Sequence, residues 1–199
     1  MRSDQTTVLE NFYLSKFPEI TERLKNEMSP GYTYHCVEHV LDVIEAAENI
    51  AMAEHTDAYT LYVVKIACLY HDIGFIYQRK DHEQKSAEIF RTDALAEGLN
   101  DSVIIDIEGC ILATQIPQAP LNEMEQIVCD ADLDYLGRTD YDRIADTLFK
   151  EMQFAGELSD PEKWKQIQIN FLRNHKYHTR FSINLRMQGL LKNLEKLQS

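Results

Sequence analysis

The 199-residue sequence has no long apolar run, although 44% of its residues are hydrophobic. A helix that crosses a bilayer needs about 20 consecutive apolar residues, so we expect no membrane span. The start of the chain, MRSDQTTVLENF, has neither the positive charge nor the apolar run of a secretory signal. We therefore expect a cytoplasmic protein.

Cysteine is scarce as well, and the sequence has no Cys-x-x-Cys pair. Three of the cysteines lie in apolar helical patterns, where a free thiol behaves as a small hydrophobic side chain. The sequence therefore predicts buried, unpaired thiols at Cys36, Cys68, Cys110 and Cys129.

Basic residues are few, with 20 Lys and Arg against 33 Asp and Glu and a formal net charge of -13. Such a charge repels the phosphate backbone of a long nucleic acid. A small anion remains a plausible ligand where basic side chains cluster locally.

The alternation that marks a half-buried strand is absent, and no repeat, low-complexity tract or linker divides the chain. Apolar residues instead recur about every 3.6 positions, which is typical of helices with one buried face. The length favours one domain over residues 1–199. We therefore predict an all-α, single-domain bundle of about eight or nine helices.

The expected helical segments follow from this period and from turn residues. The N-terminal helical region lies between Thr6 and Met28, and Pro18 should interrupt or kink it. The residues Ser-Pro-Gly at 29–31 should break the chain before the next helix. Helical patterns then cover residues 40–50, 63–70, 83–97, 102–114, 122–136, 141–154, 161–174 and 181–197.

Two histidines four residues apart open the stretch YHCVEHVLDV. Side chains at this spacing lie one above the other on a helix, so His35 and His39 face one site if the helix begins near Tyr34. The pair alone leaves three possibilities: two metal ligands, one ligand with a helper, or two core histidines.

An apolar helix ends in the stretch ACLYHDIGF, which places His71 beside Asp72. Gly74 follows and suits the left-handed turn that stops a helix. A structural alternative is that backbone groups satisfy the carboxylate and the imidazole in the interior.

A third stretch, QIVCDADLDYLGR, places three carboxylates in an apolar helical segment, where unpaired charges are costly to bury. Helical geometry puts Asp132 beside the inward-facing arc and predicts that Asp130 and Asp134 point outward. Two imidazoles and two carboxylates then meet across the core. This set suits Mn, Fe(II), Co, Ni, Zn or Mg without choosing among them.

The order of these motifs resembles the HD-domain metal-dependent phosphohydrolase superfamily, over about residues 34–137, with helices at 140–197 completing the domain. The resemblance implies that one divalent metal is bound by His39, His71, Asp72 and Asp132. His35 matches a non-ligand histidine that some members, including cyclic-nucleotide phosphodiesterases, use as an acid.

Two further segments bear on the resemblance. The segment DHEQKSAEIF is similar to a family helix whose histidine approaches the substrate phosphate or a second metal, which makes His82 a substrate-side residue. Members with two metals usually have another histidine where CILATQIP has Thr114. We therefore expect one metal rather than two.

A metal at this site would lower the pKa of a bound water and neutralise charge on a phosphoryl oxygen. Asp72 is the candidate to orient or deprotonate the water, and His35 to protonate the leaving oxygen. The candidates for phosphate binding are Arg79 and Arg138, with His82 beside them, although isolated basic residues are usually solvated. Lys80, Lys176 and Arg180 are further basic residues near these motifs, and His175 and His178 are either a second site or a polar helix end.

The expected function is hydrolysis of a phosphate ester of a small molecule, with a nucleotide favoured, by a metal-activated water. Within chemistry, the alternative is a phosphodiesterase or pyrophosphohydrolase of cyclic or signalling nucleotides. The alternative from another class is a non-catalytic ligand sensor or scaffold that contains a metal. The sequence does not indicate the oligomeric state.

Overall fold

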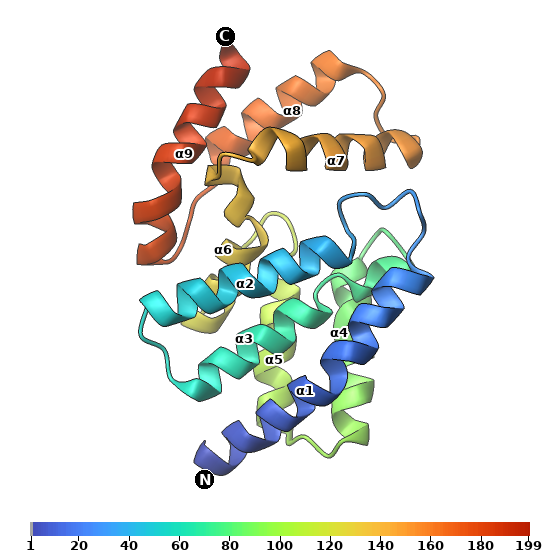
Figure 1. Ribbon diagram of the computed structural model, residues 1–199, viewed down its shortest axis with the longest axis vertical. Helices are drawn as coiled ribbons and strands as arrows, with labels where there is room; N and C mark the ends of the chain where they lie inside the picture. The colour runs from blue at the N-terminus through green and yellow to red at the C-terminus, as the bar shows by residue number, and fades with distance from the viewer. Residues whose placement is uncertain (1) are drawn as a thin grey trace.

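The computed structural model describes residues 2–199, which fold into helices joined by short loops (Figure 1). The elements are α1 (Arg2–Glu27), α2 (Val37–Ala53), α3 (Ala58–Tyr70), η1 (Ile73–Ile76), α4 (His82–Ala96), α5 (Asp101–Ala113), α6 (Glu123–Asp132), η2 (Asp134–Gly137), α7 (Tyr141–Phe154), α8 (Pro161–Asn174) and α9 (Arg180–Gln198).

The all-α prediction is confirmed, because these residues contain nine α-helices, two short 3-10 turns and no strand. The expected interruption at Pro18 is wrong, since α1 continues through it. One face of α1 packs against α3, and residues on both sides of Pro18, including Phe12 and Ile20, are buried. Tertiary packing of an apolar face supplies most helix stability, which outweighs the local cost of proline.

The helix expected at 122–136 ends earlier, at Asp132, and a 3-10 turn follows. This turn packs against α9 at two glycines. A Cβ atom on Gly189 would lie 1.9 Å from the carbonyl oxygen of Gly137, so only glycine allows the two backbones to come this close. The contact covers the end of α6 with the C-terminal helix.

This coverage also overturns the prediction that Asp130 and Asp134 point outward, because both are buried. The carboxylate of Asp130 accepts hydrogen bonds from the backbone N–H groups of His178 and Thr179 and from the Thr179 hydroxyl. Arg186 Nε donates to Asp134 Oδ1 over 2.6 Å. Buried carboxylates need such partners, and the residues that lead into α9 supply them for Asp130, whereas α9 itself supplies the partner of Asp134.

Two hydrophobic cores result, one on each side of the junction between α6 and η2. The larger core is built by α1 to α6, and the smaller one joins Tyr34 and η2 to α7, α8 and α9. In Figure 1, α7 and α8 lie together at the end of the molecule opposite the N-terminus. Phe149 of α7 stacks on Trp164 of α8, with ring centroids 5.6 Å apart.

The remaining expectations concern thiols and membranes. All four cysteines are free, as predicted; Cys68, Cys110 and Cys129 are buried as expected, whereas Cys36 is only half-buried. Within residues 2–199, none of the helices combines the length and the hydrophobicity needed to cross a bilayer.

Candidate metal centre

Four predicted ligands converge where three helices end. His39 lies in the first turn of α2, His71 follows the last residue of α3 with Asp72 next to it, and Asp132 is the last residue of α6. Helix α3 is apolar on nearly all sides and is buried along its length, which carries its C-terminal end into the core. The side chains therefore meet inside the protein.

The distances show a tight cluster. His39 Nε2 lies 3.3 Å from His71 Nε2, 3.4 Å from Asp72 Oδ2 and 3.2 Å from Asp132 Oδ1. His71 Nε2 lies 3.2 Å from Asp72 Oδ2 and 3.5 Å from Asp132 Oδ1. Neighbouring ligands of one ion, with bonds of about 2.1 Å, lie roughly 3.0 to 3.4 Å apart. The spacing fits a single ion.

Two further observations show that the donors fit a divalent metal. Asp72 Oδ2 is buried and makes no hydrogen bond, and such an atom costs free energy unless a cation compensates it. His71 Nδ1 donates to the Cys68 carbonyl over 2.7 Å, which leaves the lone pair of Nε2 for the site, as is usual for metal-binding histidines.

The ionisable side chains of the cluster shift one another's pKa values. Burial acts to lower the pKa of His71, but the carboxylates of Asp72 and Asp132 raise it well above its ordinary value. Burial acts to raise the pKa of Asp132, but the neighbouring imidazoles of His39 and His71 lower it to about 2. The carboxylates thus demand positive charge beside them, which a divalent ion supplies.

Within the described chain, His39, His71 and Asp72 form the one group of three or more such side chains whose ligand atoms lie within 4.8 Å of one another. The hydroxyl of Thr114 donates to the Ile111 carbonyl. Thr114 therefore does not supply the extra imidazole that members with two metals have at this position. Neither His175 nor His178 belongs to such a group. The expectation of one metal rather than two stays a prediction.

His82 lies beside this cluster because of Gly74. A Cβ on Gly74 would lie 2.1 Å from the carbonyl oxygen of His82, so glycine lets the start of α4 approach η1. The expected left-handed turn at Gly74 is wrong: its φ is not positive, and close approach is the reason for glycine. His82 Nε2 consequently lies 3.5 Å from Asp72 Oδ1.

His35 lies outside α2, which begins at Val37 and not near Tyr34. The buried carboxylate of Glu151, on α7, accepts hydrogen bonds from the backbone N–H groups of Tyr34 and His35. It thereby holds these residues in a loop. The same carboxylate lies 2.6 Å from His35 Nδ1, so the Nε2 edge of the ring is left for the site.

Arg79 completes this arrangement from the other side of Glu151. Its Nη1 donates to Glu151 Oε1 over 2.7 Å, and its Nε lies 2.8 Å from Glu157 Oε1. Burial acts to raise the pKa of Glu151, but His35 and Arg79 lower it to about 2. Arg79 is therefore bound to carboxylates and does not line the cavity beside the metal cluster.

Arg138 lies elsewhere. It donates to Asp42 and Asp140, in a separate surface pocket on the other side of Tyr34 and Tyr135. His39 also lines that pocket, whereas His71, Asp72 and Asp132 do not. His175 and His178 line a second cavity beside α8, in which burial and the nearby His178 lower the pKa of His175 to about 4.

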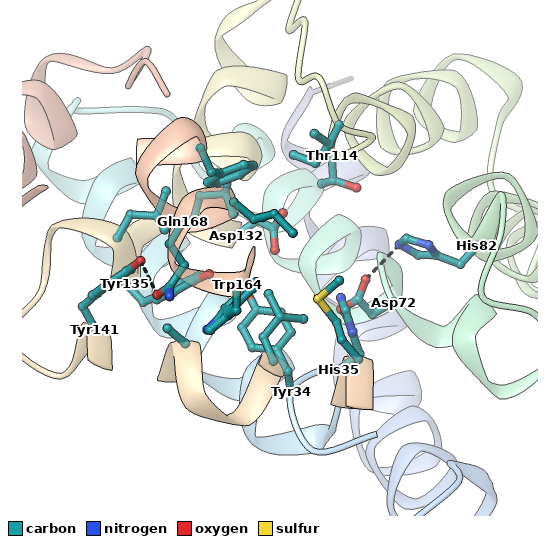
Figure 2. A pocket seen from close by; sticks show the side chains of 18 of the residues that line it. Tyr34, His35, Asp72, His82, Thr114, Asp132, Tyr135, Tyr141, Trp164 and Gln168 are labelled. Atoms are coloured by element: carbon teal, nitrogen blue, oxygen red, sulfur yellow. Dashed lines mark hydrogen bonds and ion pairs between the residues drawn. The ribbon is translucent and has the colours of Figure 1, made fainter. Parts of the chain in front are cut away.

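A cavity of about 240 Å³ opens beside the metal cluster. Figure 2 shows His35, Asp72 and His82 on one side of it, and Tyr135, Tyr141 and Gln168 on the other. The second wall comes mainly from α7 and α8. It is lined by Tyr141, Ala145, Leu148, Met152, Trp164, Ile167, Gln168 and Phe171.

Sequence reasoning missed the contributions of these two helices. Glu151 is one of 33 acidic residues, and no local pattern separates it from the solvated ones. Trp164 and Gln168 have the spacing of one helix face, which indicates a shared surface without indicating what lies against it.

Fold and site together define an all-α protein in which His39, His71 and Asp72 could hold a divalent metal, with Asp132 beside them. The chain matches the HD domain family over residues 36–135, half of its length, and it therefore belongs to the HD metal-dependent phosphohydrolase superfamily. No curated protein and no solved structure matches the chain.

Proposed function

We propose that the protein hydrolyses phosphate esters of a small molecule and that His39, His71, Asp72 and Asp132 hold the one metal that it uses. The family supports a metal-dependent hydrolase. The observation that carries the proposal is the shared cavity: Asp72 and Asp132 line it together with His35 and His82. Ligands and candidate acid thus face the same small volume.

A divalent ion held by these four residues supplies a Lewis acid for a phosphoryl oxygen and lowers the pKa of a coordinated water. Asp72 offers Oδ2 to the ion and keeps Oδ1 beside His82. His82 Nδ1 donates to the Arg79 carbonyl over 3.1 Å, so its Nε2 is oriented toward Asp72. These contacts fix the carboxylate that would orient the attacking water.

His35 is the proton donor to the leaving group in this proposal. Its Nδ1–H donates to Glu151, and its ring stacks on Phe75 with centroids 3.9 Å apart. The carboxylate and the Phe75 ring hold the imidazole so that Nε2 faces the cavity, where it would donate a proton to the leaving oxygen. A positioned acid of this kind contributes about 10²- to 10⁴-fold to a rate.

The proposal is tested by measuring metal content and phosphate release together. Wild-type protein is stripped and reloaded separately with Mn²⁺, Fe²⁺, Co²⁺, Ni²⁺, Zn²⁺ and Mg²⁺, then compared with His71→Ala, His35→Gln and His178→Ala. We expect His71→Ala to lose both metal and activity, and His35→Gln to keep the metal but lose turnover. His178→Ala is the matched histidine control and should keep both.

Two results contradict the proposal. Failure of wild type to bind stoichiometric metal, or retention of metal by His71→Ala, removes the ligand assignment. Loss of metal in His35→Gln removes the division between ligand and acid. If reloaded protein releases no phosphate from monoesters but cleaves cyclic nucleotides, the activity is that of a phosphodiesterase.

A further inference from the structure

The side of the cavity opposite the metal cluster is aromatic and aliphatic. Trp164, Phe171 and Tyr141 contribute rings to the lining, and Leu148 and Met152 contribute aliphatic side chains. Trp164 is the sole tryptophan of the chain, and Phe149 covers one of its faces. Apolar walls of this kind stabilise an apolar ligand group by removing it from water, by roughly 25 cal/mol for each Å².

Charge in the cavity is negative apart from the two imidazoles. Asp72, Asp132 and the buried Glu83 line it, and none of the residues described as lining it is a lysine or an arginine. The charge of one divalent ion at the cluster is offset by Asp72 and Asp132, so the ion's open coordination positions and the imidazoles of His35 and His82 can receive one phosphate group. A second phosphate would meet carboxylates without a cationic partner, and like charges in a confined site repel strongly.

One polar group interrupts the apolar wall. Gln168 Oε1 accepts a hydrogen bond from the Tyr141 hydroxyl over 2.9 Å, which fixes the amide and leaves its NH₂ group as a donor. Figure 2 shows this pair joined on the wall that faces the cluster. A few placed polar groups in an apolar pocket set ligand orientation.

The cavity is also small. Its volume of about 240 Å³ lies below the roughly 300 to 1,000 Å³ of pockets that hold drug-sized ligands. The organic part of the ligand must therefore be compact.

From these observations we infer that the substrate is an ester with one phosphate group and a compact, uncharged, flat organic group, which Trp164 packs against and Gln168 donates to. Nucleoside monophosphates and aryl phosphates belong to this class, and nucleoside di- and triphosphates do not. The inference rests on the proposed function and narrows it.

Two matched substrate series test it with reloaded protein. Adenosine mono-, di- and triphosphate vary the charge on one organic group, and methyl and phenyl phosphate vary the organic group at one charge. We expect kcat/KM for the monophosphate to exceed that for the diphosphate by about tenfold or more. We also expect kcat/KM for phenyl phosphate to exceed that for methyl phosphate by about tenfold or more, since burying a ring stabilises the bound substrate by ~1–3 kcal/mol.

Variants of α8 residues test whether the apolar wall contacts the organic group of the substrate. Trp164→Ala should lower kcat/KM for phenyl phosphate about tenfold, mainly by raising KM. It should change kcat/KM for methyl phosphate by less than about threefold. Trp164→Phe should recover most of the loss. Gln168→Leu should lower kcat/KM for adenosine monophosphate and leave kcat/KM for phenyl phosphate unchanged. Lys163→Ala, on the exposed side of α8, is the control for folding and should change neither.

Preference for the di- or triphosphate, equal use of methyl and phenyl phosphate, or an equal loss on both esters in folded Trp164→Ala overturns the inference. If no ester is hydrolysed, the proposed function fails, and calorimetric binding of phenylphosphonate and methylphosphonate then decides the inference. At least about tenfold tighter binding of phenylphosphonate to wild type, lost in Trp164→Ala, supports it; equal binding of the two probes contradicts it.

Discussion

The two halves of this molecule build different parts of one site. The helices up to η2 place the four candidate ligands at helix ends, inside a large core. The helices after it, α7 to α9, form a smaller core and contribute Glu151 and the apolar wall of the cavity. The family match covers the first part only, over residues 36–135. The match therefore includes the four candidate ligands and does not extend to α7, α8 and α9.

The largest effect should come from removing a candidate metal ligand in the first half of the molecule. Asp132→Ala removes one ligand and leaves His39 and His71 without the carboxylate between them. We expect metal affinity to fall and activity to drop by about a thousandfold or more, because the activated water is lost. Metal analysis after dialysis and a phosphate-release assay measure both. Asp146→Ala, on the exposed side of α7, should leave both unchanged.

The second effect separates proton transfer from metal binding. Glu151→Gln should retain the metal but lower kcat for phenyl phosphate by about a hundredfold, the range of a positioned acid. For 4-nitrophenyl phosphate, whose leaving group needs no proton, the loss should stay below about tenfold. His35→Gln should show the same contrast, and the double variant should be little worse than either single one. An equal loss on both substrates would point to a merely structural role.

Stability at low pH should depend on the same carboxylate. The pKa of Glu151 is lowered from 4.5 to about 2, so its contribution is fully present above about pH 4.5 and is lost as the pH falls toward 2. The shift corresponds to a contribution on the order of 3 kcal/mol to the free energy of unfolding. Urea unfolding at pH 5, 4 and 3 should show a steeper fall for wild type than for Glu151→Gln. Parallel curves would contradict this assignment.

The smallest effect concerns Arg138, whose assignment to substrate binding stays a prediction. Because Asp42 and Asp140 already bind its guanidinium, we expect Arg138→Ala to change KM by less than about twofold and to lower the free energy of unfolding by about 1 kcal/mol. Arg143→Ala, on a highly exposed side chain, is the control. A rise in KM of tenfold would restore Arg138 to the substrate site.

The sequence predicted the helices and the ligand-bearing ends well, because both are local. Helix period and Pro161 located α8 over its full length, and the His71–Asp72 pair stands at the end of an apolar run. The errors have one physical cause, which is packing between distant segments. Asp130 and Asp134 are bound by Thr179, just before α9, and by Arg186 of α9, and Glu151 reaches His35 from 116 residues away. No local pattern contains such contacts.

Gly74 shows the same limit at a single residue. Its type was visible in the sequence, but the reason for it was not, because the obstructing atom belongs to His82 on the next helix. Conversely, the four candidate ligands were proposed because the order of their motifs resembles the HD family, and the structure brings their side chains together.

Anomalous diffraction from crystals soaked in Mn²⁺ tests the central claim most directly. The account predicts one strong peak at a bond distance of about 2.1 to 2.3 Å from His39 Nε2, His71 Nε2, Asp72 Oδ2 and Asp132 Oδ1 together. A peak bound by other residues, or none at this cluster at saturating Mn²⁺, would contradict it.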